Sequence, residues 1–245
     1  MCYSDDAAPP APPVLGEIGD HGDLVLTSTD GTPFAAYHAS PAAGSTRGIV
    51  ILPDVRGLHQ FYKELALRFA EAGLHAIAFD YFGRTAGLGS RGEEFAYREH
   101  VEKTQPQTIA EDVGAAVGWL RERPGATTVF SVGFCFGGSH SWGQSAAGHG
   151  LAGCMGFYGV PSRVESLVPR MRAPLLLLAA GADFTPVQTV AAFAEQVRAN
   201  GTEATLAVFD SMPHSFFDRT YAEHEQACAR AWSEMLSFMA AHTAD

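Results

Sequence analysis

The stretch Gly133-Phe134-Cys135-Phe136-Gly137-Gly138 decides the fold of this chain. It follows the apolar run 128–132, which has the composition of a buried strand, and an apolar helix pattern comes after it. A strand, a sharp turn and a helix form the context of a nucleophile elbow, G-x-S-x-G, here with cysteine in the serine position. Gly133 and Gly137 flank a residue with a strained backbone, and a Cβ on either would crowd the neighbouring strand and helix. The turn lifts the Cys135 sulfur to a helix N-terminus, which favours the thiolate.

Apolar strand patterns and helix patterns alternate on both sides of this elbow. Such strands, each followed by a helix, predict a mostly parallel twisted sheet with helices on both faces. The pair Asp30-Gly31 between two β-prone runs predicts an N-terminal β-hairpin. The predicted strands are 24–27, 34–37, 48–52, 74–79, 128–132, 153–158, 174–180 and 204–209, and the predicted helices are 62–72, 109–121, 138–147, 187–200 and 221–241.

The length of 245 residues suits one α/β domain with a large core, although it does not exclude two small domains. We expect a single domain over residues 15–245. Residues 1–14 are rich in Pro and Ala and carry no apolar core of signal-peptide length, so we expect a flexible lead-in. Residues 81–107 form a long connection that contains Gly and charged residues. We expect it to act as a lid or pocket wall.

Charge and composition exclude several classes of partner. The net charge of −11 argues against nucleic acid or an anionic membrane, and no apolar run approaches the roughly 20 residues of a membrane span. The four cysteines show no close pairing, which predicts reduced thiols and a cytoplasmic protein. The His and Cys spacings fit no zinc site, and the Gly-rich stretches fit neither a phosphate-binding nor a dinucleotide motif. We therefore expect neither a metal nor a cofactor.

Two later strand ends supply partners for the cysteine. Asp183 follows the apolar strand 174–180, and His214 follows the strand 204–209. Nucleophile, acid and histidine in this order, each at the carboxyl end of a strand, are the arrangement of an α/β-hydrolase triad. Taken alone, Asp183 could cap the next helix instead, and Asp210 is an alternative acid.

These residues resemble the dienelactone hydrolase family of α/β-hydrolases over residues 48–241. The family's cysteine elbow G-x-C-x-G-G is matched at Cys135, its acid turn is resembled by 181–186, and its histidine turn by 213–216. The resemblance implies an α/β-hydrolase fold and a small lactone or ester as substrate, as in dienelactone hydrolysis.

The resemblance also implies roles for three charged residues. Asp54, in the stretch 53–57, corresponds to an acidic residue that contacts and helps to activate the thiol. It is one methylene shorter than the usual Glu, and it could instead cap the following helix or pair with Arg56. Arg84 matches by position an arginine that binds the substrate carboxylate, and Arg219 lies near a second one, shifted by one residue. Either arginine could instead be a solvated surface charge.

The predicted mechanism is nucleophilic catalysis by Cys135. Backbone N–H groups of Phe136 and Val55 would bind the oxyanion, while His214, held by Asp183, would activate water against the thioester. A general carboxylesterase or thioesterase is one alternative, and a non-enzymatic thiol sensor is another. A sensor thiol needs no oriented base, which argues against the last reading. The aromatic residues expected near the site, which suit a small and partly apolar ligand, are Phe82, Phe134, Tyr158 and Phe216.

Overall fold

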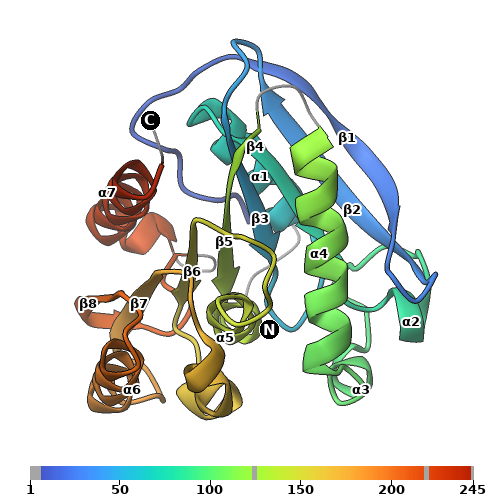
Figure 1. Cartoon of the computed structure of the whole chain (residues 1–245). Coiled ribbons are helices and arrows are strands. Elements are labelled where there is room, and N and C mark those ends of the chain that lie inside the picture. Colours follow the sequence, from blue (N-terminus) through green and yellow to red (C-terminus); the bar gives the residue numbers. More distant parts are fainter. Residues whose placement is uncertain (1–6, 123–125, 218–220, 244–245) are drawn as a thin grey trace.

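The computed structural model describes residues 7–122, 126–217 and 221–243. Eight strands form one twisted sheet in the order β1-β2-β4-β3-β5-β6-β7-β8 (Figure 1). The strands are β1 (Ile18–Thr27), β2 (Pro33–Pro41), β3 (Arg47–Leu52), β4 (His75–Phe79), β5 (Thr128–Phe134), β6 (Gly153–Phe157), β7 (Leu175–Ala182) and β8 (Ala204–Pro213).

The sheet is antiparallel only at its N-terminal edge. The hairpin β1–β2 turns through Gly31, whose φ of 84° suits glycine, and β2 then pairs antiparallel with β4. All pairs from β4 through β3 and β5 to β8 are parallel. The predicted α/β sheet with an N-terminal hairpin is confirmed. Parallel strands bring their carboxyl ends to one edge, which is where chemistry gathers in such folds.

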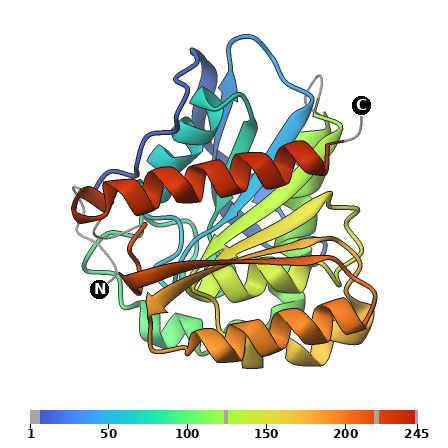
Figure 2. The same cartoon turned by 90° about the vertical axis from the view of Figure 1, so that its left-hand side faces the viewer.

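Helices cover both faces of the sheet (Figure 2). They are α1 (Gln60–Glu71), α2 (Gly83–Ala86), α3 (Tyr97–Val101), α4 (Pro106–Glu122), α5 (Phe136–Gln144), α6 (Val187–Ala199) and α7 (Glu225–Ala241), with short 3₁₀ turns η1 (Pro161–Arg163), η2 (Glu165–Arg170) and η3 (Tyr221–Glu223). Residues of α1 and α7 share one core cluster, and residues of α4, α5 and α6 share the other.

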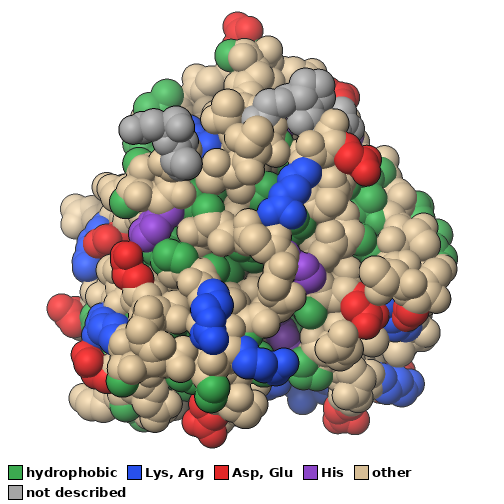
Figure 3. Space-filling model, in the orientation of Figure 1, with side chains coloured by type: hydrophobic (Ala, Val, Ile, Leu, Met, Phe, Trp, Pro, Cys, Tyr) green, Lys and Arg blue, Asp and Glu red, His purple; other side chains and the backbone are tan. Residues whose placement is uncertain are grey.

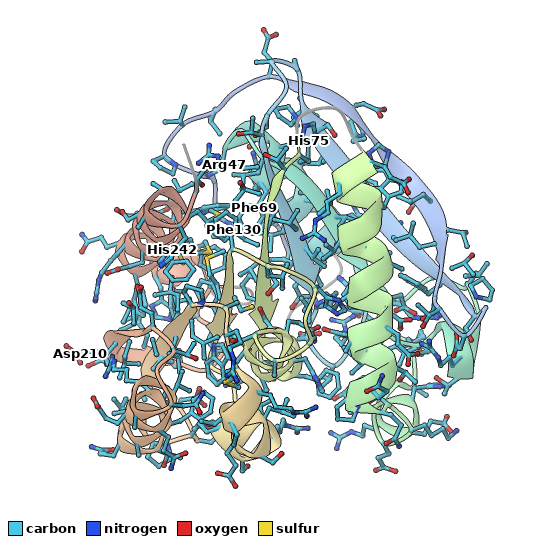
Figure 4. The ribbon with its side chains drawn as sticks, in the orientation of Figure 1. Arg47, Phe69, His75, Phe130, Asp210 and His242 are labelled. Carbon is cyan, nitrogen blue, oxygen red and sulfur yellow. The ribbon has the colours of Figure 1, made fainter. Side chains whose placement is uncertain are left out.

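The strand β3 shows why two cores form. Ile49 and Ile51 belong to the cluster with α1 and α7, and Val50 belongs to the opposite one, because successive side chains of a strand point to opposite faces. Phe69 of α1 and Phe130 of β5, both labelled in Figure 4, lie in the first cluster. Burial on both faces is the reason that the central strands read as continuous apolar runs.

Several elements differ from their predicted bounds. The connection 81–107 is not irregular throughout, because it contains α2, α3 and the start of α4. The strand β8 continues to Pro213, four residues beyond the predicted end, since Ala182 of β7 pairs with Pro213 after a register shift. This extension carries the two strands together to the edge where Asp183 and His214 follow.

The described part of the predicted flexible lead-in is packed rather than loose. Residues 7–12, which we call the N-terminal strap, include buried prolines, and Ala7 packs against the core. The Trp232 indole N–H donates to the Pro10 carbonyl over 3.1 Å. These contacts were not predicted, because a proline-rich composition does not show whether an apolar surface such as that of α7 is available to pack against.

The surface of the described residues carries mixed charges and no large apolar area on the face that Figure 3 draws. On the face drawn in Figure 3, basic and acidic side chains are interspersed, and the apolar side chains show as separate small areas. Within residues 7–122, 126–217 and 221–243, no helix has the length and apolarity that a membrane crossing needs.

Candidate active site

The turn from β5 into α5 holds Cys135 in a strained backbone conformation. Its φ is 55° and its ψ is −109°, a region that L-residues with a side chain rarely adopt. A Cβ on Gly133 would lie 1.9 Å from the Gly137 carbonyl oxygen, and a Cβ on Gly137 would lie 2.1 Å from the Leu52 carbonyl oxygen. The predicted crowding at both glycines is confirmed, and it explains how the elbow helix can press directly against β3.

Asp183 and His214 form a close pair at the same edge of the sheet. His214 Nδ1 lies 2.9 Å from Asp183 Oδ1 and 3.0 Å from Oδ2, and the carboxylate is 2% exposed. An ionised carboxylate accepts from an Nδ1–H, so Asp183 fixes the tautomer that leaves Nε2 available as a base. The pairing follows from the register of the two strands, because the residues just before them, Ala182 and Pro213, are paired.

Two aromatic rings pack against the imidazole of His214. The Tyr158 ring centroid lies 4.8 Å from that of His214, and the Phe184 centroid lies 4.5 Å away. Tyr158 directly follows Phe157, whose carbonyl accepts from the Cys135 backbone N–H over 3.1 Å. The ring that packs against His214 therefore belongs to the residue next to the one that binds the elbow backbone. Phe184 is 69% exposed, and the sequence analysis missed it, although its place directly after the acid was a usable signal.

The alternative acid, Asp210, lies elsewhere. It is exposed on β8, and Figure 4 shows it at the outer edge of the molecule. The imidazole of His214 pairs with Asp183, so the structure favours Asp183 over Asp210 as its partner.

The loop after β3 carries the predicted oxyanion donor Val55. Asp54 is fully buried and its Oδ1 accepts from the backbone N–H of Arg56 over 2.9 Å. Asp54 therefore contacts Arg56 through the backbone N–H of that residue. The Asp54 backbone N–H donates to the Tyr62 hydroxyl over 2.9 Å, and the Tyr81 hydroxyl donates to the Pro53 carbonyl over 2.6 Å. In the sequence, Tyr62 is recognisable only as part of a helix pattern.

The pKa of Tyr81 is raised by its surroundings. Burial raises the pKa of Tyr81 well above its ordinary value, and the negative charges of Asp54, Asp80 and Cys135 add to that effect. The phenol therefore stays a protonated donor at any ordinary pH.

Arg84 is bound to acidic partners from distant segments. Its Nη1 donates to both carboxylate oxygens of Asp112, at 2.9 and 2.7 Å, and its Nε donates to Asp30 Oδ2 at 2.9 Å. A third donor reaches the Ser28 hydroxyl at 2.8 Å. These contacts do not support the predicted carboxylate-binding role of Arg84, which stays a prediction. Arg219 lies outside the described residues.

A cavity of about 360 Å³ lies beside the loop after β3, and its lining includes Leu58, Asp80 and Arg91. Asp80 and Arg91 form a buried ion pair with Nη2 2.9 Å from Oδ2. None of the described lining residues belongs to the predicted triad, so we do not assign this cavity to the substrate.

Comparison with known proteins agrees with the fold. Residues 34–243 match the model of the Dienelactone hydrolase family. A carboxymethylenebutenolidase of Rhodococcus opacus is 28% identical over 176 residues, which cover 71% of this chain and 66% of the relative. A dienelactone hydrolase-like promiscuous phosphotriesterase from metagenomic libraries has a TM-score of 0.76 at 22% identity, covering 91% of this chain and 99% of that one. Brefeldin A esterase, a bacterial homologue of human hormone-sensitive lipase, has a TM-score of 0.73 at 14% identity, covering 97% and 80%.

Proposed function

Since the chain belongs to the dienelactone hydrolase family of ester and lactone hydrolases, we propose that it cleaves a small lactone or ester through Cys135, His214 and Asp183. The observation that carries the proposal is the Asp183–His214 pair, whose imidazole packs against Tyr158, the residue after the one whose carbonyl binds the Cys135 N–H. A cysteine on a strained turn at a helix N-terminus, together with an oriented histidine, is the arrangement of covalent nucleophilic catalysis.

In the first step, the Cys135 thiolate attacks the acyl carbon of the substrate, and a C–S bond forms. The tetrahedral oxyanion is stabilised by the backbone N–H groups of Phe136, at the start of α5, and Val55, in the loop after β3. Collapse of this intermediate breaks the acyl C–O bond, and the leaving oxygen takes a proton from the His214 imidazolium. The products of this step are a thioester acyl-enzyme and a released, or for a lactone still tethered, hydroxyl or enol group.

In the second step, His214 Nε2 removes a proton from water, and the hydroxide attacks the thioester. The same two N–H groups bind the second oxyanion. The C–S bond then breaks, and the thiolate returns to Cys135. Asp183 stabilises the transient imidazolium in both steps, because it is buried and hydrogen-bonded to Nδ1.

We propose a small, partly apolar acyl group as the substrate, of the dienelactone type. The aromatic rings of Tyr158 and Phe184 beside His214 support an apolar ligand. The name of the Rhodococcus opacus relative supports a lactone. A general carboxylesterase or thioesterase of the same fold is the second candidate. It is favoured by the engagement of Arg84 with Asp112, which leaves that arginine's role in binding a carboxylate without support.

The test compares p-nitrophenyl acetate with an enol-lactone that bears a carboxylate, using wild type and Cys135→Ala. We expect Cys135→Ala to lower kcat by at least about 10³-fold on both substrates, as loss of a nucleophile does. Cys228→Ala, a buried cysteine on α7, is the matched control and should keep wild-type rates. Trapping of an acyl adduct on Cys135, detected by mass spectrometry, would support the thioester. Unchanged turnover by Cys135→Ala would refute the nucleophile assignment. A wild type inactive on every ester would instead favour the thiol sensor.

A further inference from the structure

We propose that Tyr62 and Tyr81 are positioning residues for oxyanion stabilisation, because their hydroxyls hold both sides of the Pro53–Asp54 peptide group that precedes Val55. The inference rests on the proposed function, in which the Val55 N–H is an oxyanion donor. Neither tyrosine touches the reacting atoms in this proposal. Both act through the backbone of the loop after β3.

The two hydroxyls bind one peptide plane. The Tyr81 hydroxyl donates to the Pro53 C=O over 2.6 Å, and the Tyr62 hydroxyl accepts from the Asp54 N–H over 2.9 Å. These C=O and N–H groups belong to the same peptide unit, and in a trans peptide they point in opposite directions. Tyr62 comes from α1 and Tyr81 follows β4, so the plane is held from two separate elements. A rotation of this peptide would break both hydrogen bonds.

The next peptide unit is fixed as well. It consists of the Asp54 C=O and the Val55 N–H, and the Asp54 C=O accepts from the Gly57 N–H over 3.2 Å. The Asp54 carboxylate accepts from the Arg56 N–H, which closes the same turn. With the preceding plane held by the tyrosines and this carbonyl held by Gly57, the direction of the Val55 N–H is determined.

Tyr81 also contacts the second half of the oxyanion site. Its ring packs edge-on against the ring of Phe136, with centroids 5.3 Å apart, and Phe136 supplies the other proposed donor. The Pro53 carbonyl that Tyr81 binds lies directly against the elbow helix, because a Cβ on Gly137 would lie 2.2 Å from its oxygen. Tyr81 thus contacts Phe136, which carries one proposed donor, and the loop that carries the other. These two contacts set the distance between the donors.

The chemistry of the phenol suits this role. Tyr81 is almost fully buried, and its raised pKa keeps the hydroxyl protonated, so it donates to the carbonyl throughout the working pH range. A buried hydroxyl keeps one position, whereas a water molecule can reorient. It therefore keeps the backbone donor preorganised, and preorganised donors make an oxyanion site effective.

The test compares Tyr81→Phe, Tyr62→Phe and the double variant with wild type, using p-nitrophenyl acetate as the probe. We expect each single variant to lower kcat by about 10- to 100-fold at an unchanged KM, below the 10²–10³-fold effect of removing a donor outright. Tyr37→Phe, which removes a hydroxyl that binds His21 on the hairpin, is the matched control and should keep wild-type kcat.

A second readout separates positioning from general loosening of the structure. A thionoester places sulfur, a weaker hydrogen-bond acceptor, where the oxyanion forms, so the ratio of ester to thionoester rates reports on the oxyanion donors. We expect this ratio to fall in Tyr81→Phe and to stay at the wild-type value in Tyr37→Phe. Both residues hold the same peptide plane. We therefore expect the double variant to lose less activity than the sum of the two single effects, expressed as free energies, would give.

The inference is overturned if Tyr81→Phe is folded and keeps kcat within twofold of wild type, or if its ester-to-thionoester ratio is unchanged. Should Tyr81→Phe fail to fold, Tyr62→Phe decides by the same two criteria. Failure of the proposed function looks different: Cys135→Ala would then keep full turnover, whatever the tyrosine variants do.

Discussion

The elbow around Cys135 and the turn around Arg84 are built alike and stabilised differently. Each follows the carboxyl end of a strand that flanks β3 and opens a helix, α5 or α2. At the elbow, the close approaches join backbone to backbone, as between Gly137 and the carbonyls that end β3. At Arg84, side-chain charges from Asp30 and Asp112 hold the turn. A geometry set by glycines within six residues can be read from a motif, whereas a charge neutralised by partners far along the chain cannot.

The largest effect should come from breaking the backbone contact at the elbow. We expect Gly137→Ala to cost more than about 4 kcal/mol of unfolding free energy, since its Cβ would meet two carbonyl oxygens at 2.1 and 2.2 Å. Urea unfolding followed by circular dichroism measures this effect. The matched control is Gly118→Ala on α4, where a Cβ meets nothing within 4 Å. There the substitution should stabilise the helix by up to about 1 kcal/mol. Equal stability of the two variants would contradict the account of the elbow.

The sequence predicted those parts of the site that follow from local rules. Asp183 and His214 could be found because each directly follows an apolar strand, and parallel strands end at one edge. The ion pairs of Arg84 could not be found, because Asp112 and Asp30 lie 28 and 54 residues away and pairing of charges leaves no local pattern. The role of Tyr62 could not be found for a related reason. A buried ring is enough to account for a tyrosine in an amphipathic helix pattern, so the pattern gives no sign that the hydroxyl has a role.

An intermediate effect should come from removing the charge at the second turn. Burial raises the pKa of Asp112, and the hydrogen bonds from Arg84 oppose this rise. Arg84→Met therefore leaves a buried carboxylate without its cation, and we expect a loss of about 3 kcal/mol in unfolding free energy. Arg98→Met, an exposed arginine on α3, should change stability by less than about 0.5 kcal/mol.

The KM of Arg84→Met for two substrates tests whether this arginine has a role in substrate binding. If Arg84 binds a substrate carboxylate, Arg84→Met will raise KM for the carboxylate-bearing lactone and leave KM for p-nitrophenyl acetate unchanged. Our structure-based expectation is the opposite: any change in KM will be the same for both substrates, and the stability loss will dominate.

The smallest effect concerns a titratable group inside the elbow helix. Burial, followed by the charge of Arg163, lowers the pKa of His140 from 6.5 to about 4. The folded state thus disfavours a proton that the unfolded chain accepts, so stability is complete above pH 6.5 and falls as pH decreases toward 4. By pH 5 the loss from this residue should reach about 2 kcal/mol.

Urea unfolding of wild type and His140→Gln at pH 7.5 and pH 5 measures the contribution of His140 to the pH dependence of stability. The pH dependence of unfolding free energy should be flatter in His140→Gln by about the predicted amount. His21→Gln, at an exposed position on β1, should keep the wild-type slope. A wild-type slope in His140→Gln would mean that the elbow helix admits a charged imidazole.

The contact between the N-terminal strap and α7 has a consequence for the order of events during biosynthesis. Pro10 and Trp232 are 222 residues apart, so this hydrogen bond cannot form while the ribosome makes most of the chain. The strap can complete its docking only after α7 has emerged, so some of the first described residues are among the last to make all their contacts. Detachment of α7 would also break the hydrogen bond to Pro10, so we expect the strap and α7 to become accessible to proteases together.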